Sequence, residues 1–202
     1  MRYKTILIFG APGSGKGTQG HTLGTIPRFF HCACGDVFRS LDTRTPLGQR
    51  FLEYSSKGKL VPDEVTVQLW QARIQDVVSS HTFKPDIDFL VLDGIPRNVA
   101  QANLMETLIE VVRVFHLSVG TNYDELAKRL QKRALKDNRL DDASDEVIAK
   151  RIKTYLAESR PLIEHYGKDL VKTIDARQAP VTVLFDILQT LRDESILPQA
   201  KF

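Results

Sequence analysis

The sequence predicts an α/β fold in which a parallel sheet is covered by helices on both faces. Short apolar runs alternate with longer amphipathic segments, a glycine-rich loop joins the first run to a helix, and another run ends in Asp93. Buried parallel strands are nearly continuous apolar runs, and helices supply the crossovers between them. The 202 residues are enough for one domain with a full hydrophobic core.

Strands are expected where apolar runs are bounded by turn residues. They cover Tyr3–Phe9, Phe29–Ala33, residues 88–94, Val112–Leu117 and Val171–Asp175. Helices are expected from amphipathic spacing and from start signals, such as Pro62 followed by two acidic residues. They run from the glycine-rich loop to about Leu23, over Asp63–Val78, Asn98–Ile109 and Tyr123–Leu135, from near Ser144 to Pro161, and over Pro180–Arg192. Pro161 should kink or end the helix that meets it.

Composition and charge argue against several classes of protein. The chain is 42% hydrophobic and 26% charged, which is typical of globular proteins, and no stretch resembles a membrane helix of about 18 apolar residues. The net charge of +3 is too small to indicate a nucleic-acid partner. Cys32 and Cys34 are too close for a disulfide framework, and their spacing is not that of a zinc site. We therefore expect a cytoplasmic protein without a membrane or nucleic-acid partner.

The stretch GAPGSGKGTQ, residues 10–19, is a candidate phosphate-binding loop between the first strand and the first helix. It fits G-x-x-x-x-G-K-[ST], except that Gly17 stands where a hydroxyl normally holds Mg²⁺ and Thr18 comes one residue late. Backbone N–H groups and a helix N-terminus would bind phosphate, and Lys16 can reach the β- and γ-phosphates of a nucleotide. Asp93, at a strand end, is placed to hold Mg²⁺ through water.

Several arginines lie where a purely structural role explains them poorly. Arg97 follows a strand end, Arg129 and Arg133 flank one helical stripe, Arg139 lies in a short polar loop, and Arg151 borders a buried helix face. One such arginine could simply be a solvated or ion-paired surface residue. Together, beside a phosphate loop, they suit phosphoryl transfer, because the guanidinium fork binds and neutralises phosphate. A nucleoside monophosphate acceptor is already anionic at pH 7, so this chemistry needs no general base.

These motifs resemble the adenylate kinase branch of the nucleoside monophosphate kinases. The resemblance spans residues 6 to about 188 and rests on GAPGSGKGTQ, CGDVFR, GKLVPDE, LDGIPRNVAQ, RLQKR followed by RLDD, KRIKTY and PLIEHY. Loops of this family read GKGT, so Gly17 is the expected residue there. The resemblance implies a P-loop kinase core with a monophosphate-binding insert at about residues 34–64 and a short lid at about residues 134–142. It also implies Mg²⁺ with ATP, and a lid too short to hold structural zinc.

The resemblance further implies a monomeric enzyme that catalyses ATP + AMP ⇌ 2 ADP. Its implied ATP-binding residues are Gly13, Ser14, Gly15, Lys16, Gly17, Thr18, Arg129, Arg133 and Gln178. Its implied AMP-binding residues are Cys34, Arg39, Lys59, Leu60, Val61, Gly94, Arg97, Gln101, Arg139 and Arg151. The catalytic set expected to stabilise the transferred phosphoryl group is Lys16, Arg97, Arg133, Arg139 and Arg151.

Two positions depart from the family pattern. Cys34 stands where AMP-selective members carry Thr and UMP/CMP kinases tend to carry Ala, whereas Gln101 matches the AMP-type pattern and can pair with an adenine edge. In DARQAPV, residues 175–181, Ala176 replaces the usual Gly, which leaves the contacts of Gln178 with the ATP base open. The alternatives are a UMP/CMP kinase of the same fold and a nucleotide-binding sensor without turnover, although a mere binder has no need of the arginines.

Overall fold

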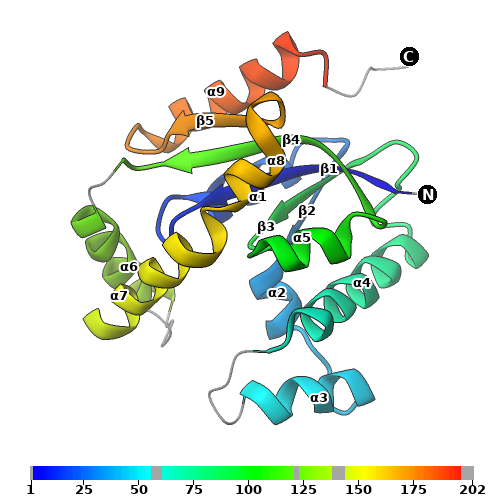
Figure 1. Ribbon diagram of the computed structural model, residues 1–202. Helices are drawn as coiled ribbons and strands as arrows, with labels where there is room; N and C mark the ends of the chain where they lie inside the picture. Colours follow the sequence, from blue (N-terminus) through cyan, green and yellow to red (C-terminus); the bar gives the residue numbers. More distant parts are fainter. Residues whose placement is uncertain (1, 56–60, 121–122, 138–143, 197–202) are drawn as a thin grey trace.

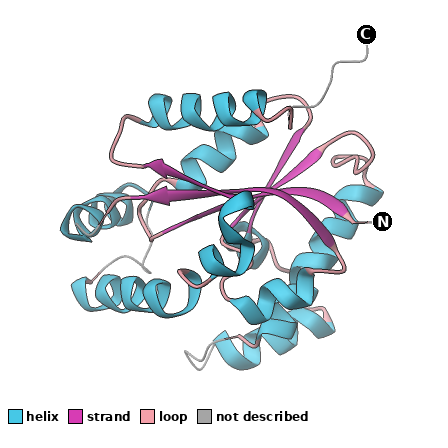
Figure 2. Cartoon of the chain, turned by 45° about the horizontal axis from the view of Figure 1, so that its top comes forward, coloured by secondary structure: helices cyan, strands magenta, loops and turns pink. Residues whose placement is uncertain are grey.

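The computed structural model describes residues 2–55, 61–120, 123–137 and 144–196, without the side chains of 55, 123–124 and 133–137. These residues form a five-stranded, all-parallel sheet between layers of helices (Figures 1 and 2). The strands β1 (Tyr3–Gly10), β2 (Phe29–Ala33), β3 (Phe89–Asp93), β4 (Ile109–Ser118) and β5 (Val171–Asp175) lie in the order β2-β3-β1-β4-β5. The α-helices are α1 (Lys16–Gly24), α2 (Cys34–Arg39), α3 (Pro46–Ser55), α4 (Asp63–Ser79), α5 (Val99–Met105), α6 (Tyr123–Asp137), α7 (Asp145–Thr154), α8 (Leu162–Leu170) and α9 (Pro180–Asp193).

The central position of β1 brings the chemically important strand ends together. β1 pairs in parallel with β3 and with β4, and the register places Ile8 opposite Asp93. Because parallel strands end at the same edge of the sheet, the glycine-rich loop after Gly10 and the Asp93 carboxylate lie side by side. The predicted α/β class and the shared strand edge are both confirmed.

Alternation along the strands builds a core on each face of the sheet. Ile6 and Ile8 of β1 join a buried cluster with residues of α1 and α9. Leu7 and Phe9 point to the other face and join residues of α4, α5 and α8, including the fully buried Trp70. Successive side chains of a strand point to opposite faces, so a strand covered on both sides must be apolar throughout. Figure 2 shows helices on both sides of the strands.

Two neighbouring elements have different bounds from those expected. The helix expected over Asn98–Ile109 ends at Met105, and the strand expected over Val112–Leu117 is the longer β4, Ile109–Ser118. The strand begins early because Ile109 pairs with Tyr3 at the start of β1. Pairing with a strand distant in sequence thus decided this boundary, which the apolar spacing around it leaves open.

The helical path between Ser144 and Pro161 is interrupted, as Pro161 predicts. The Ser144 side chain caps α7 by accepting a 3.3 Å hydrogen bond from the backbone N–H of Val147. The path then continues as a π-helical segment, Tyr155–Ser159, and Pro161 precedes the separate helix α8. The separate helices α2, α3 and α8 were not expected from the sequence.

The two expected inserts are covered to different extents. Helices α2 and α3 and the first two residues of α4 fall within residues 34–64, while residues 138–142 of the expected lid lie outside the described part of the chain. In Figure 1, α6 and α7 lie on one side of the molecule and α2, α3 and α4 on the other. Their assignment as mobile inserts stays a prediction. Among the described helices, none combines the length and apolar character needed to cross a bilayer.

Candidate active site

The glycine-rich loop folds into a tight turn between β1 and α1. Gly13 and Gly15 have φ values of 83° and 95°, a region that side chains with a Cβ rarely adopt. Gly15 directly precedes Lys16, the first residue of α1, so the orphan N–H groups of the first helical turn face the loop. The ammonium of Lys16 donates to the carbonyl oxygens of Gly10 at 2.8 Å and Ala11 at 3.0 Å. The loop therefore combines a helix N-terminus with a positive charge held across it.

A cavity of about 540 Å³ opens at this loop and gathers most of the predicted site residues. Both sides of the molecule contribute to it, because α2 and the end of β3 line it together with the start of α1, α6 and α7. The predicted residues among its lining are Gly13, Gly15, Lys16, Gly17, Thr18, Arg39, Asp93, Gly94, Arg97, Arg129 and Arg151. Four arginines and one lysine thus surround a single space, as a site for polyphosphate anions requires.

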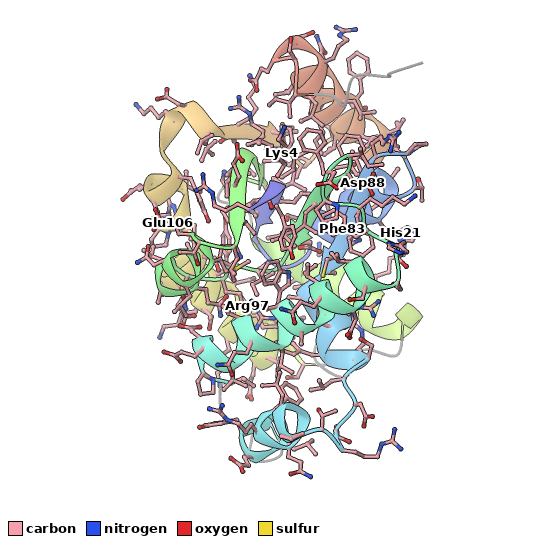
Figure 3. The ribbon with its side chains drawn as sticks, turned by 90° about the vertical axis from the view of Figure 1, so that its right-hand side faces the viewer. Lys4, His21, Phe83, Asp88, Arg97 and Glu106 are labelled. Atoms are coloured by element: carbon pink, nitrogen blue, oxygen red, sulfur yellow. The ribbon has the colours of Figure 1, made fainter. Side chains whose placement is uncertain are left out.

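Arg97 lies in the cavity wall and contacts its neighbours through its guanidinium group. Its Nε donates to the Gly94 carbonyl at 3.1 Å, and its guanidinium carbon lies 5.8 Å from the centre of the Phe38 ring. Its Nη2 lies 4.0 Å from the Cys34 sulfur. Figure 3 shows Arg97 near the middle of the molecule in that view. Cation–π and hydrogen-bond contacts of this kind limit the rotamers of a long side chain and pre-orient its fork.

Two other arginines that line the cavity, Arg39 and Arg129, each form an ion pair with an acidic side chain. Arg39 pairs with Asp36 at 2.5 Å, and Arg129 pairs with Glu125 at 2.6 Å. Arg129 also donates to the Ala176 carbonyl at 3.2 Å, which ties α6 to the turn after β5. These pairs are substantially exposed, so each contributes little to stability and can exchange its carboxylate for a phosphate at small cost.

The region of Asp93 fits a hydrated metal ion. A Cβ added to Gly17 would lie 3.5 Å from Asp93 Oδ2, so the missing side chain leaves room beside this carboxylate. Carboxylate and hydroxyl oxygens are the ligands that Mg²⁺ prefers, and Mg²⁺ keeps several waters when it binds protein. Asp93 and Thr18 both line the cavity. The donor set therefore suits Mg²⁺ held through water. Among the described residues, no three His, Cys, Asp or Glu side chains converge as metal ligands, and the absence of structural zinc stays a prediction.

Gln101 lies behind the cavity wall rather than in its lining. Its side chain is only 3% exposed, and its amide oxygen accepts from the backbone N–H of Arg97 at 2.8 Å. Its amide nitrogen donates to Asp63 Oδ1 at 2.6 Å. The buried amide is therefore anchored at both ends.

Both cysteines are buried free thiols, as expected for small apolar groups. Burial raises the pKa of the Cys32 thiol to about 12. Burial also raises the pKa of Cys34, although the neighbouring Arg97 acts in the opposite direction. Neither thiol is suited to redox or nucleophilic chemistry near neutral pH, because the reactive species is the thiolate.

The remaining predicted residues are placed elsewhere. Ser14 is a buried residue of the loop itself, Val61 packs against the apolar core, and Gln178 donates to the Asp175 carbonyl and to Asp186. Lys59, Leu60 and Arg139 lie outside the described residues, and so does the side chain of Arg133 in α6.

The cavity also contains residues that the sequence reasoning did not assign. His21, His31 and Asp36 line it beside the phosphate loop. Burial lowers the pKa of His31, while the nearby Asp93 and Asp36 carboxylates oppose this effect. His21 lies one helical turn after Thr18, which is the only sequence signal that points to it. His31 and Asp36 reach the cavity through strand pairing and chain reversal, for which the sequence carries no comparable local signal.

The chain is similar to known adenylate kinases. Its residues 8–171 match the family described as adenylate kinase. A protein named adenylate kinase from Cyanothece sp. is 36% identical over 202 residues, which cover 95% of this chain and 98% of the relative. Proteins of the same name from Corynebacterium diphtheriae and Mycolicibacterium smegmatis are 36% and 37% identical, and the matches cover 82% and 85% of this chain and 87% and 90% of the relatives. The matched region contains every residue of the cavity.

Proposed function

Because the chain belongs to the adenylate kinase family, we propose that it catalyses the reversible transfer of a phosphoryl group from ATP to AMP, which gives two ADP. The observation that carries this proposal is the cavity in which the phosphate loop, Asp93 and four arginines meet. Two highly charged nucleotides must approach each other for in-line transfer, and positioning with charge neutralisation supplies most of the catalysis.

The two sides of the cavity suggest the places of the two substrates. Gly13 to Thr18 provide backbone N–H groups and Lys16 for the phosphates of ATP, with Arg129 on the same side. Arg39, Gly94 and Arg97 lie on the α2 and β3 side, where the phosphate of AMP would bind. Arg151 reaches the cavity from α7 and would contact the transferred group, together with Arg133 and Arg139. The AMP phosphate is itself the nucleophile, so no protein base is required.

We propose that Asp93 holds Mg²⁺ through water, with Thr18 nearby. The bound ion would neutralise charge on the ATP phosphates, which is the chemistry that Mg²⁺ supplies in phosphoryl transfer. The chain's own contribution is the oxygen donor set, the space beside Gly17 and the arginines that complete the neutralisation.

AMP is favoured as acceptor over the pyrimidine nucleotides by family membership and by Gln101. Cys34, which lies against Arg97, matches neither the AMP-type nor the UMP/CMP-type residue at its position. A coupled assay of ATP·Mg²⁺ with AMP, UMP, CMP and GMP tests this choice, with Cys34→Thr beside the wild type. Fast turnover with AMP alone supports the proposal. A preference for UMP or CMP would transfer the same mechanism to a pyrimidine acceptor, and binding of ATP without turnover would indicate a sensor.

Arg97 provides the sharpest test of the catalytic set. We expect Arg97→Ala to lower kcat by about 100-fold or more, because a pre-oriented donor to the transferred charge is lost. Arg97→Lys should recover little, since an ammonium lacks the planar fork. Arg44→Ala is the control: Arg44 lies in the expected monophosphate-binding insert, pairs with Asp42, and is not in the cavity lining. Near-normal turnover of Arg97→Ala would refute the role of Arg97.

We also propose that the enzyme acts as a monomer in the cytoplasm. Two unpaired thiols are consistent with a reducing compartment. Sedimentation equilibrium of the purified chain tests the oligomeric state.

A further inference from the structure

The buried amide of Gln101 is fixed in one orientation by partners of opposite character. The backbone N–H of Arg97 can only donate a hydrogen bond, so the 2.8 Å contact must be made by the amide oxygen. A carboxylate accepts hydrogen bonds, so the 2.6 Å contact with Asp63 must be made by the amide nitrogen. Turning the amide over would place donor against donor and acceptor against carboxylate. The usual ambiguity of a glutamine side chain is thereby removed.

Asn98 extends this network and holds Asp63 in place. The side-chain oxygen of Asn98 caps α5 by accepting from the backbone N–H of Gln101 at 2.8 Å. Its side-chain nitrogen therefore faces Asp63 and donates to Oδ2 at 3.1 Å. Asp63 is the first residue of α4, so the network joins the acceptor-side insert to the segment after β3. Three side chains share one set of donors and acceptors, and neither of the two amides can turn over alone.

A fixed amide discriminates between purines that a free amide would accept equally. A carboxamide has two N–H groups and two lone pairs, so the bonds to Arg97 and Asp63 use one of each. Adenine presents an amino donor beside a ring-nitrogen acceptor, whereas a 6-oxopurine presents an oxygen acceptor beside a ring N–H donor. A glutamine that turns over matches either base, but a glutamine held in one orientation matches only one.

We propose that Asp63 is a positioning residue that sets acceptor specificity, because it fixes the Gln101 amide so that the site accepts AMP and rejects 6-oxopurine monophosphates. This inference rests on the proposed function and on the contact with the acceptor base that the family resemblance implies for Gln101, which lies directly behind the cavity wall. Asp63 acts through Gln101 and need not touch the nucleotide. Rejection follows because the wrong base leaves buried polar groups unpaired.

Inosine monophosphate is the appropriate probe, since it differs from AMP at the 6-position and at the neighbouring ring nitrogen. The measured quantity is the ratio of kcat/KM for AMP to kcat/KM for inosine monophosphate, because the amount of active enzyme cancels from it. We expect the wild type to favour AMP and Asp63→Asn to lower the ratio by about tenfold, since the partner that can only accept is lost and the backbone N–H of Arg97 alone is left to oppose turning of the Gln101 amide. Glu64→Gln, an exposed neighbour in the same helical turn, is the control of equal charge change and should leave the ratio unchanged.

Further variants separate positioning from folding. Asp63→Ser replaces the carboxylate with a hydroxyl that donates or accepts, and it suits the first turn of a helix, so it should lower the ratio even if Asp63→Asn folds poorly. In a Gln101→Ala background, Asp63→Asn should no longer change the ratio.

The outcomes distinguish this inference from the proposed function. An unchanged ratio in folded, AMP-active Asp63→Asn and Asp63→Ser would overturn the role of Asp63 and leave the AMP reaction intact. Equal losses of both activities at constant ratio would likewise assign Asp63 a structural role only. A wild type that phosphorylates neither purine would overturn the proposed function, and with it this inference.

Discussion

The close packing of α1 on β2 leads to a prediction about two glycines and one histidine. Gly20 and Gly24 lie one helical turn apart in α1 and both face His31. A Cβ added to Gly24 would lie 2.6 Å from the Cβ of His31. A Cβ added to Gly20 would instead meet the far end of the ring, including Cδ2 at 2.7 Å. The two glycines therefore probe different parts of the same side chain.

The expected cost of Gly24→Ala follows from these distances. Carbon atoms in contact normally lie about 3.5–4.0 Å apart, so α1 and β2 would have to separate by about 1 Å. Overpacking of this kind costs about 1–3 kcal/mol, while alanine recovers at most about 1 kcal/mol of helix propensity. We expect the free energy of unfolding to fall by about 1–2 kcal/mol, which lowers the Tm by about 2–8 °C in a chain of this length.

Urea denaturation of single and double variants provides the assay, with the midpoint and slope both fitted. His31→Ala removes the ring but keeps the Cβ. It should therefore relieve Gly20→Ala, with a coupling energy of about 1 kcal/mol or more, and should leave the cost of Gly24→Ala unchanged within about 0.5 kcal/mol. Stabilisation by Gly24→Ala, or equal relief of both glycine variants by His31→Ala, would refute the reasoning.

Two further predictions concern pH and metal. Burial raises the pKa of Cys32 from 9.0 to about 12. Between these pH values the folded state keeps a proton that the unfolded state loses. The stability that the protonated thiol contributes is therefore complete below pH 9 and is lost as the pH rises toward 12. Between pH 9 and 10.5 the free energy of unfolding of the wild type should fall by up to about 1.4 kcal/mol per pH unit more steeply than that of Cys32→Ala, and parallel curves would contradict the assignment. Chelation of Mg²⁺ should abolish transfer, and Asp93→Asn should raise the Mg²⁺ concentration for half-maximal rate by about tenfold, since outer contacts tune metal affinity strongly; an unaltered Mg²⁺ requirement would remove Asp93 from the metal site.

Local sequence patterns predicted most of the helices and strands. The elements that were missed or given other bounds are those for which the neighbouring residues carry little local signal. β2, β5 and the start of α4 match the expected bounds: the two strands are short apolar runs, and a Pro–Asp start signal marks the beginning of α4. No Gly or Pro separates α5 from β4, and only the pairing of Ile109 with Tyr3 decides where the strand begins. α2 has six residues and follows β2 directly, without a side-chain cap, so it carries almost no local signal.

The candidate site likewise contains residues that local sequence patterns predicted and residues that only the tertiary structure places there. The phosphate loop was predictable because its residues are consecutive, and Asp93 because an apolar strand leads directly to it. The tertiary structure brings Arg39, Arg97 and Arg151 around one cavity; the positions of Arg97 and Arg151 in the sequence already indicated a phosphate site, whereas Arg39 was implied only by family resemblance. It also brings in His21 and His31, which no motif indicated.

The sequence by itself determined the α/β class, the phosphate loop with Lys16, and the supply of arginines for a phosphoryl-transfer site. These features depend on periodicity and spacing within a few residues, which the local chain encodes directly. Only the tertiary structure decided that Gln101 is anchored between Asp63 and the backbone of Arg97. Asp63 and Gln101 are 38 positions apart, and their contact exists because α4 and α5 pack on the same face of the sheet. A hydrogen bond depends on the final positions of both partners, and packing of the whole core sets those positions.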